Sequence, residues 1–255
     1  MKFIGVDLGW SSGASGVCSL SWDGDRLEIL ELTTILELES ILAWIDRQAP
    51  LNTPALVAID APTIITNQTG MRLADKLTHK HFGRYHAGCY PANLGLKFAP
   101  RTTGFSQSLG TRQFIHAPTI AAQKPGRYQI EVFPHPATIN LFGLDKILKY
   151  KKGRLAERTQ ELRKLRGHIV KTLPQLLPTL SPLSLERVPA IAARQTGKEL
   201  KAIEDCLDSL LCAYVGAHWW YWGEADAKNL VLGDLATGFI IVPGVGTASH
   251  QSPIT

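Results

Sequence analysis

Two aspartates stand where nearly apolar strands are expected to end. Asp7 lies within the segment 3–9, and Asp60 directly follows the apolar run 55–59. A carboxylate at such a place costs free energy unless it is paired or binds a cation. Ligands of open α/β sheets gather at the carboxyl ends of strands, so both aspartates are candidates for one site. The alternatives are an aspartate that caps backbone amides at position 7 and one that forms a turn at position 60.

A second pair of acids lies on a predicted helix. Asp205 and Asp208 are three residues apart in the predicted helix 198–222 and therefore share a face. The residues that follow are nearly all apolar, which is typical of a buried helix. We expect both acids near the site, with Asp208 deeper along the helix, although one of them could be only a hydrogen-bonding acid near the helix start.

Two further candidates come near the end of another predicted strand, at 127–133. Glu131 could be a further carboxylate of the site or a partner of the others, and His135 could move protons or orient a substrate. The alternative for His135 is a loop histidine held by a backbone carbonyl.

Oxygen ligands from several elements, without paired cysteines, suit Mg²⁺ or Mn²⁺ better than zinc. Two such ions about 4 Å apart can activate a water and stabilise a leaving oxygen in phosphodiester cleavage. The predicted metal ligands are Asp7, Asp60, Asp205 and Asp208. We expect these four and Glu131 to form the catalytic cluster.

The segment 61–126 offers weaker constellations. Arg72 and Arg84 are candidates for contacting phosphate or another anion, and His135 joins them as a weak candidate for binding substrate. A set of possible zinc ligands has irregular spacing, which makes a zinc site the less favoured interpretation; its members are His79, His81, His86 and Cys89.

A mixed sheet would bring the acids together. Asp23-Gly24-Asp25 is a hairpin signal between two of the expected strands, and Pro134 stops a later one. The expected elements are strands at 2–8, 15–22 and 26–34, a helix at 37–48, a strand at 55–60, a helix at 70–80 within an insert at 61–126, and a strand at 127–133. The remainder is expected to hold a basic helix at 154–173, the helix at 198–222, a hairpin from 229 and a disordered tail at 246–255.

This order predicts a single α/β domain over residues 1–245. Its sheet would be mixed and five-stranded, with three antiparallel strands followed by two parallel ones, flanked by helices, and with the insert between the fourth and fifth strands. That order is typical of ribonuclease H-like domains, and also of one half of an actin-like or sugar-kinase-like protein. In the ribonuclease H-like arrangement the first and fourth strands are parallel neighbours, which would place Asp7 beside Asp60.

Composition limits the partners. The chain has 255 residues and a net charge of +5, and ten Lys or Arg but only two acids lie between Lys146 and Lys171. This permits nucleic-acid binding, while a solvated helix face is the alternative. No apolar run reaches the roughly 18 residues of a membrane span. Without a recognisable signal peptide or a CxxC motif, we expect a reduced cytoplasmic protein; its oligomeric state is not indicated.

Several motifs together resemble a known family. They are the segments 5–9, 58–62, 72–75, 131–136 and 204–210, and the closing segment 238–243 is similar too. In this order they resemble the uncharacterised family numbered 429 among domains of unknown function, described as predicted ribonuclease H-like nucleases. The resemblance implies an acidic site formed by Asp7, Asp60 and the pair Asp205 and Asp208, with Glu131 beside it.

The leading hypothesis is a metal-dependent nuclease or phosphodiesterase that acts on nucleic acid. One alternative is a nucleotide-binding protein, because the segment 7–13 resembles the phosphate hairpin of actin-like kinases; the chain is too short for the second domain that those proteins need. The other alternative is a non-catalytic protein that retains the fold.

Overall fold

The computed structural model describes residues 1–10, 13–225 and 227–245. Its first three strands, β1 (Lys2–Asp7), β2 (Ser15–Trp22) and β3 (Leu27–Ile35), pair antiparallel, as predicted. The turn between β2 and β3 is closed by Asp23, whose Oδ1 accepts hydrogen bonds from the backbone N–H groups of Asp25 and Arg26, each at 2.8 Å. The predicted tail at 246–255 lies outside the described residues.

The other half of the sheet is parallel. β4 (Ala55–Ile59) pairs with β1 on one side and with β6 (Arg127–Glu131) on the other, and β5 (Ile115–His116) pairs with β6 at the edge. The strand order is β3-β2-β1-β4-β6-β5. The sheet therefore has six strands, and the expectation of five was wrong because a two-residue strand is too short to produce a periodic pattern. The predicted parallel pairing that places the ends of β1 and β4 side by side is confirmed.

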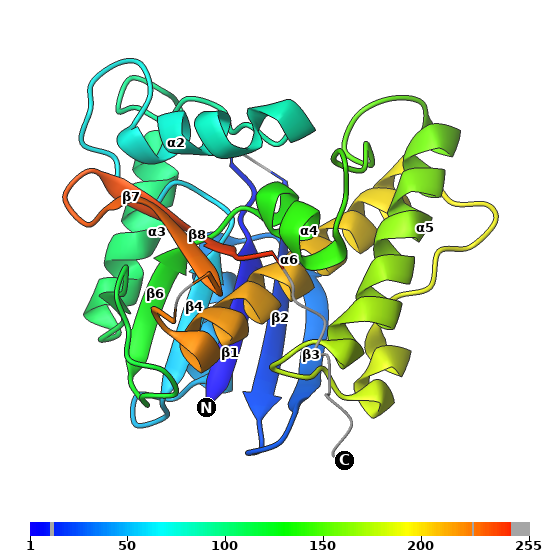
Figure 1. Cartoon of the computed structure of the whole chain (residues 1–255), viewed down its shortest axis with the longest axis horizontal. Helices are drawn as coiled ribbons and strands as arrows, with labels where there is room; N and C mark the ends of the chain where they lie inside the picture. The colour runs from blue at the N-terminus through cyan, green and yellow to red at the C-terminus, as the bar shows by residue number, and fades with distance from the viewer. Residues whose placement is uncertain (11–12, 226, 246–255) are drawn as a thin grey trace, which may run out of the picture.

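Helices cover both faces of the sheet (Figure 1). On one face the long helix α6 (Gly197–Trp222) packs across β1, β2 and β4, joined there by α4 (Pro134–Phe142) and α5 (Leu155–Thr172). On the other face lie α1 (Leu38–Gln48) and α3 (Ala99–Thr111). A capping box starts α6: the Thr196 hydroxyl accepts a hydrogen bond from the Glu199 N–H, and the Glu199 carboxylate accepts one from the Thr196 N–H.

The segment 61–126 is more ordered than an elaborated loop. It holds α2 (Leu73–Phe82), a short 3₁₀ helix η1 (Gly83–Tyr85), α3 and β5. The hairpin predicted from residue 229 is present as β7 (Asn229–Asp234) and β8 (Gly238–Pro243), and it packs on α2. Two more 3₁₀ helices, η2 (Leu173–Gln175) and η3 (Pro182–Arg187), lie between α5 and α6. In the described part of the chain, no helix is long and apolar enough to cross a membrane.

Candidate active site at the carboxyl edge of the sheet

Asp7 meets Asp205 at the end of β1. Side chains alternate along a strand, and Phe3 faces the core beneath α6, so Asp7 points to the same side. Opposite Asp7, in β2, stands Gly16, where an added Cβ would lie 1.8 Å from the backbone oxygen of Asp205. This close approach lets the Asp7 carboxyl donate a hydrogen bond to Asp205. Burial raises the pKa of both acids, and the charge of Asp205 adds to the rise for Asp7.

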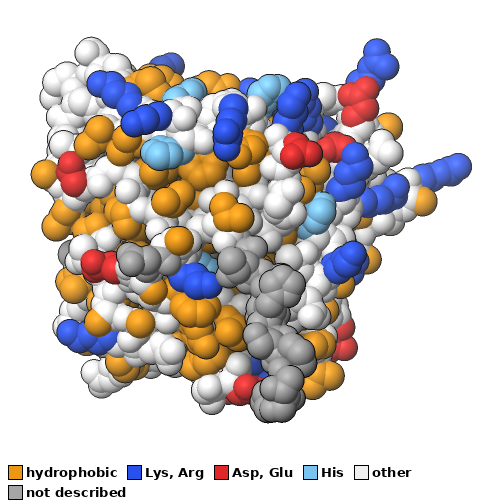
Figure 2. Space-filling model, in the orientation of Figure 1, with side chains coloured by type: hydrophobic (Ala, Val, Ile, Leu, Met, Phe, Trp, Pro, Cys, Tyr) orange, Lys and Arg blue, Asp and Glu red, His pale blue; other side chains and the backbone are white. Residues whose placement is uncertain are grey.

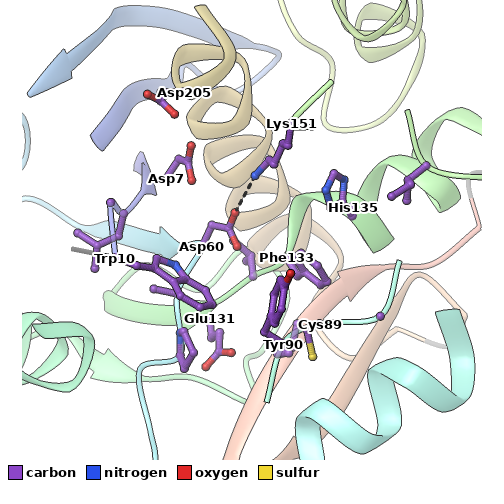
Figure 3. A pocket seen from close by; sticks show the side chains of 18 of the residues that line it. Asp7, Trp10, Asp60, Cys89, Tyr90, Glu131, Phe133, His135, Lys151 and Asp205 are labelled. Carbon is purple, nitrogen blue, oxygen red and sulfur yellow. Dashed lines mark ion pairs between the residues drawn. The ribbon is translucent and has the colours of Figure 1, made fainter. Parts of the chain in front are cut away.

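Asp60 and Asp208 are joined through a lysine. The Nζ atom of Lys151 lies 2.8 Å from Oδ2 of Asp208. It also lies 3.8 Å from Oδ2 of Asp60, an ion pair that the dashed line in Figure 3 marks. Tyr150 donates a hydrogen bond of 2.8 Å to the other oxygen of Asp208, whose side chain is fully buried. Asp208 therefore lies behind Lys151, deeper along the helix than Asp205, as the sequence predicted.

Burial and neighbouring like charges raise the pKa values of Asp60 and Asp7. Burial raises the pKa of Asp60 to about 7; Lys151 opposes this shift, and Asp208 and Glu131 add to it. Burial likewise raises the pKa of Asp7 well above its ordinary value, against Lys151 and with the help of Asp208. Burial therefore favours the protonated form of Asp7 and Asp60 more than it would at the protein surface.

A second lysine, Lys201, pairs with the acids that α6 contributes. Lys201 forms ion pairs with Asp205 and with Glu204, and Glu204 is also bound by Arg158 at 3.2 Å. Burial raises the pKa of Asp205, and the ammonium group of Lys201 lowers it in part. Lys151 and Lys201 give two positive charges against the four aspartates, so they do not neutralise the cluster when all four are ionised.

The donor set suits a hard divalent cation, because carboxylates arrive from β1, β4 and α6. Among the described residues, however, no group of three or more His, Cys, Asp or Glu side chains is arranged to hold a metal ion. The ammonium groups of Lys151 and Lys201 stand between the acids and supply positive charge there. The residues fit Mg²⁺ or Mn²⁺ in ligand type and charge, provided that the two lysines give way.

Glu131 ends β6 at the same edge, but other groups hold its carboxylate. Arg72 approaches its two oxygens at 2.7 and 2.8 Å, and the backbone N–H of Thr63 donates a third hydrogen bond. Arg72 also binds Asp75 at 2.8 Å, and all three charged side chains are buried. Glu131 and Arg72 both line the cavity beside the aspartates. Their predicted catalytic and substrate-binding roles would require these contacts to open.

Of the two remaining predicted residues, only His135 lines the cavity, and Arg84 does not. His135, at the start of α4, lines the cavity, and burial lowers its pKa to about 4, so that its ring is neutral at pH 7. Its Nδ1 atom is buried without a hydrogen-bond partner in the described structure. Arg84 is not among the described residues that line the cavity; its guanidinium lies 4.6 Å from the centre of the Tyr85 ring.

The weaker zinc hypothesis finds no matching geometry. Nε2 of His79 lies 2.8 Å from the backbone oxygen of Cys89, at hydrogen-bond distance. Burial also raises the pKa of the Cys89 thiol to about 12, which keeps it protonated. In the described residues, these side chains do not gather into a metal-holding group.

A cavity of about 660 Å³ opens beside the acids. Residues that the sequence did not single out contribute to its wall: Trp10, Tyr90, Lys149, Lys151, Lys152 and Lys201. Lys201 carried a local signal, since it lies four residues before Asp205 on the same helix. The other three lysines lie in the basic segment between Lys146 and Lys171, whose charge permitted nucleic-acid binding but did not indicate this cavity.

The comparisons with known proteins identify a family but no activity. The family model described as "Protein of unknown function (DUF429)" matches residues 5–229. No curated protein matches the chain.

Proposed function

The chain belongs to the DUF429 family, and we propose that it is a metal-dependent phosphodiesterase with a ribonuclease H-like carboxylate site. The observation that supports this most is that Asp7, Asp60 and Asp205 line one cavity, where burial raises the pKa of each. Carboxylates that must hold protons at neutral pH form a site that a divalent cation would relieve. The strand order, with β1 and β4 adjacent and parallel, agrees with the ribonuclease H-like assignment.

In this proposal Asp7, Asp60 and Asp205 hold Mg²⁺ or Mn²⁺, which would lower the pKa of a bound water and stabilise the leaving oxygen. Asp208 does not line the cavity and acts with Tyr150 to keep Lys151 in place. Lys201 would then be free to turn toward the oxygens of a phosphate group, while Lys151 keeps its ion pair with Asp208.

Cleavage and metal binding test the proposal separately. We expect Mn²⁺-dependent hydrolysis within a panel of single-stranded and duplex nucleic acids and small phosphoesters, and a loss of at least 100-fold in Asp7→Asn and in Asp60→Asn. Asp46→Asn is the matched control, because Asp46 is an exposed carboxylate of α1 that binds Arg112. Tight metal binding without any cleavage would overturn the catalytic proposal, and turnover of ATP would favour a nucleotide-binding protein instead.

Titration calorimetry adds a readout that does not depend on cleavage. Since the acids hold protons before the cation enters, Mn²⁺ binding at pH 6.5 should release protons, seen as a heat that depends on the ionisation enthalpy of the buffer. Asp46→Asn should release as many protons as the wild type. Binding without proton release would contradict the placement of the cation among these acids.

A further inference from the structure

The cavity has an aromatic side that the proposed hydrolysis does not use. Trp10 follows β1 and Tyr90 follows α2, and both line the cavity beside Asp60 (Figure 3). They remain exposed, by 36% for Trp10 and 66% for Tyr90. The ring of Phe98 supports Trp10 from behind, with the ring centres 4.4 Å apart. Two exposed aromatic rings at one cavity provide flat apolar surfaces on which a planar group of a ligand can stack.

Positive charge accompanies these rings. The Nζ atom of Lys152 donates a hydrogen bond of 2.9 Å to the Tyr90 hydroxyl and lies 5.4 Å from the centre of its ring. Lys149 and Lys151 line the same cavity. A ligand that reaches both the rings and the acids would therefore meet aromatic faces and ammonium groups in the same cavity.

We propose that this cavity binds a nucleotide whose base is unpaired, with the base against Trp10 and Tyr90 and its phosphate toward Lys149 and Lys152. Aromatic platforms beside a cationic groove are the features that bind single-stranded nucleic acid. A cavity of about 660 Å³ has the size of a small-molecule site. Bases within a duplex have both faces covered by their neighbours, so they cannot use these rings. The phosphate position rests on the proposed function, whereas base binding does not.

Equilibrium binding tests base recognition without catalysis. The probes are a fluorescent single-stranded oligonucleotide, the same strand with abasic sites, its blunt duplex and a nucleoside monophosphate, all measured in EDTA so that metal-dependent cleavage cannot contribute. We expect the single strand to bind at least fivefold more tightly than the abasic strand or the duplex. A monophosphate that competes fully would identify a free nucleotide as sufficient, and one that does not would identify the unpaired strand as the ligand.

Substitutions of Trp10 and Tyr90 test whether these two rings are the ones that bind the base. Trp10→Leu and Tyr90→Leu should each weaken binding of the single strand by about 5- to 140-fold, the range that stacking on one aromatic ring gives. Neither should change binding of the abasic strand. Tyr90→Phe keeps the ring and should recover most of the affinity, and Leu183→Ala, an exposed apolar residue of η3, is the control.

The outcomes separate this inference from the proposed function. Equal binding of abasic and normal strands, or wild-type affinity in both leucine variants, would overturn base recognition even if Mn²⁺-dependent cleavage is found. Ring-dependent binding in a protein that cleaves nothing would support base recognition and count against the phosphodiesterase. Absence of binding by every probe would also overturn this inference.

Discussion

The role of each acid in this site depends on which donors already hold it. Glu131 receives hydrogen bonds from Arg72 and from the Thr63 backbone, which leaves its oxygens occupied. The nearest cation to Asp60 is Lys151, at 3.8 Å, and Lys151 lies closer to Asp208. The charge of Asp60 is therefore only partly compensated, and its protonation should respond to solution conditions.

This imbalance predicts how stability depends on pH. The pKa of Asp60 is about 7 in the folded protein and has an ordinary value of 3.8. Between these values the folded chain binds a proton that the unfolded chain lacks, so the free energy of unfolding should fall as pH rises, by at most about 1.4 kcal/mol per pH unit for this group. Asp60→Asn should flatten the fall between pH 5 and 7, as measured by urea unfolding in EDTA.

The control for this prediction is Asp46→Asn, because Asp46 pairs with Arg112 at the surface. Its unfolding free energy should follow pH with the slope of the wild type. Slopes that are equal in Asp60→Asn and in the wild type would show that Asp60 is ionised throughout this range.

The candidate acids could be predicted from sequence because each stands in a recognisable local context. Asp7 and Asp60 end apolar strands, and Asp205 and Asp208 share a helix face. Lys151 had no such context, since it lies in a basic segment between α4 and α5 that the pattern placed at the surface. Only the tertiary arrangement brings this segment across the end of β4, and local sequence patterns carry no information on that.

At the scale of elements, two glycines set the distance between α6 and the sheet. An added Cβ at Gly5 of β1 would lie 1.9 Å from the backbone oxygen of Ser209, and one at Gly16 of β2 would lie 1.8 Å from that of Asp205. Both contacts are with helix backbone, which cannot rotate away as a side chain can. The absence of side chains at these positions therefore brings the acids of α6 to the acid of β1.

Gly16→Ala should consequently disturb both packing and the site. We expect a loss of about 1–3 kcal/mol in unfolding free energy or a failure to fold, because the helix must move away from the strand. In folded protein the proton release that accompanies Mn²⁺ binding should also fall. The matched control is Gly104→Ala in α3, where an added Cβ meets no atom within 4 Å and better helix propensity should stabilise slightly. Equal stability of Gly16→Ala and the wild type would contradict this account.

Proline and glycine residues explain why the sequence patterns did not reveal the helices α3 and α4. α3 contains Pro100, Gly104 and Gly110, which weaken the helical signal, and the surrounding fold compensates for them. α4 begins at Pro134, and a proline that cannot continue a strand is well suited to the first turn of a helix. The longer strands and the helices α1, α2, α5 and α6 were predicted because their apolar periodicity extends over enough residues.

At the scale of the whole molecule, most of the positive charge on α5 has structural partners. Arg163 donates to the backbone oxygen of Ala192 at 2.6 Å, and Arg166 donates to that of Pro189 at 2.9 Å. These contacts fasten the chain between α5 and α6. Figure 2 shows Lys and Arg side chains gathered over the part of the molecule where Figure 1 places α5. Such a surface favours nucleic acid in general, but many of its arginines are already engaged.

Salt dependence can therefore distinguish the cavity rim from the helix surface. If Lys149 and Lys152 contact phosphates, the double variant Lys149→Ala/Lys152→Ala should lower the slope of log K against log salt for single-stranded binding by about 1.4, which is about 0.7 for each phosphate that is no longer neutralised. The double variant Lys164→Ala/Lys171→Ala removes the same charge from α5 and should leave the slope nearly unchanged. Equal reductions in both variants would mean that binding follows net charge, and a reduction only in the second would place the phosphates along α5. The expected difference would assign the phosphate contacts to the cavity that the aspartates border.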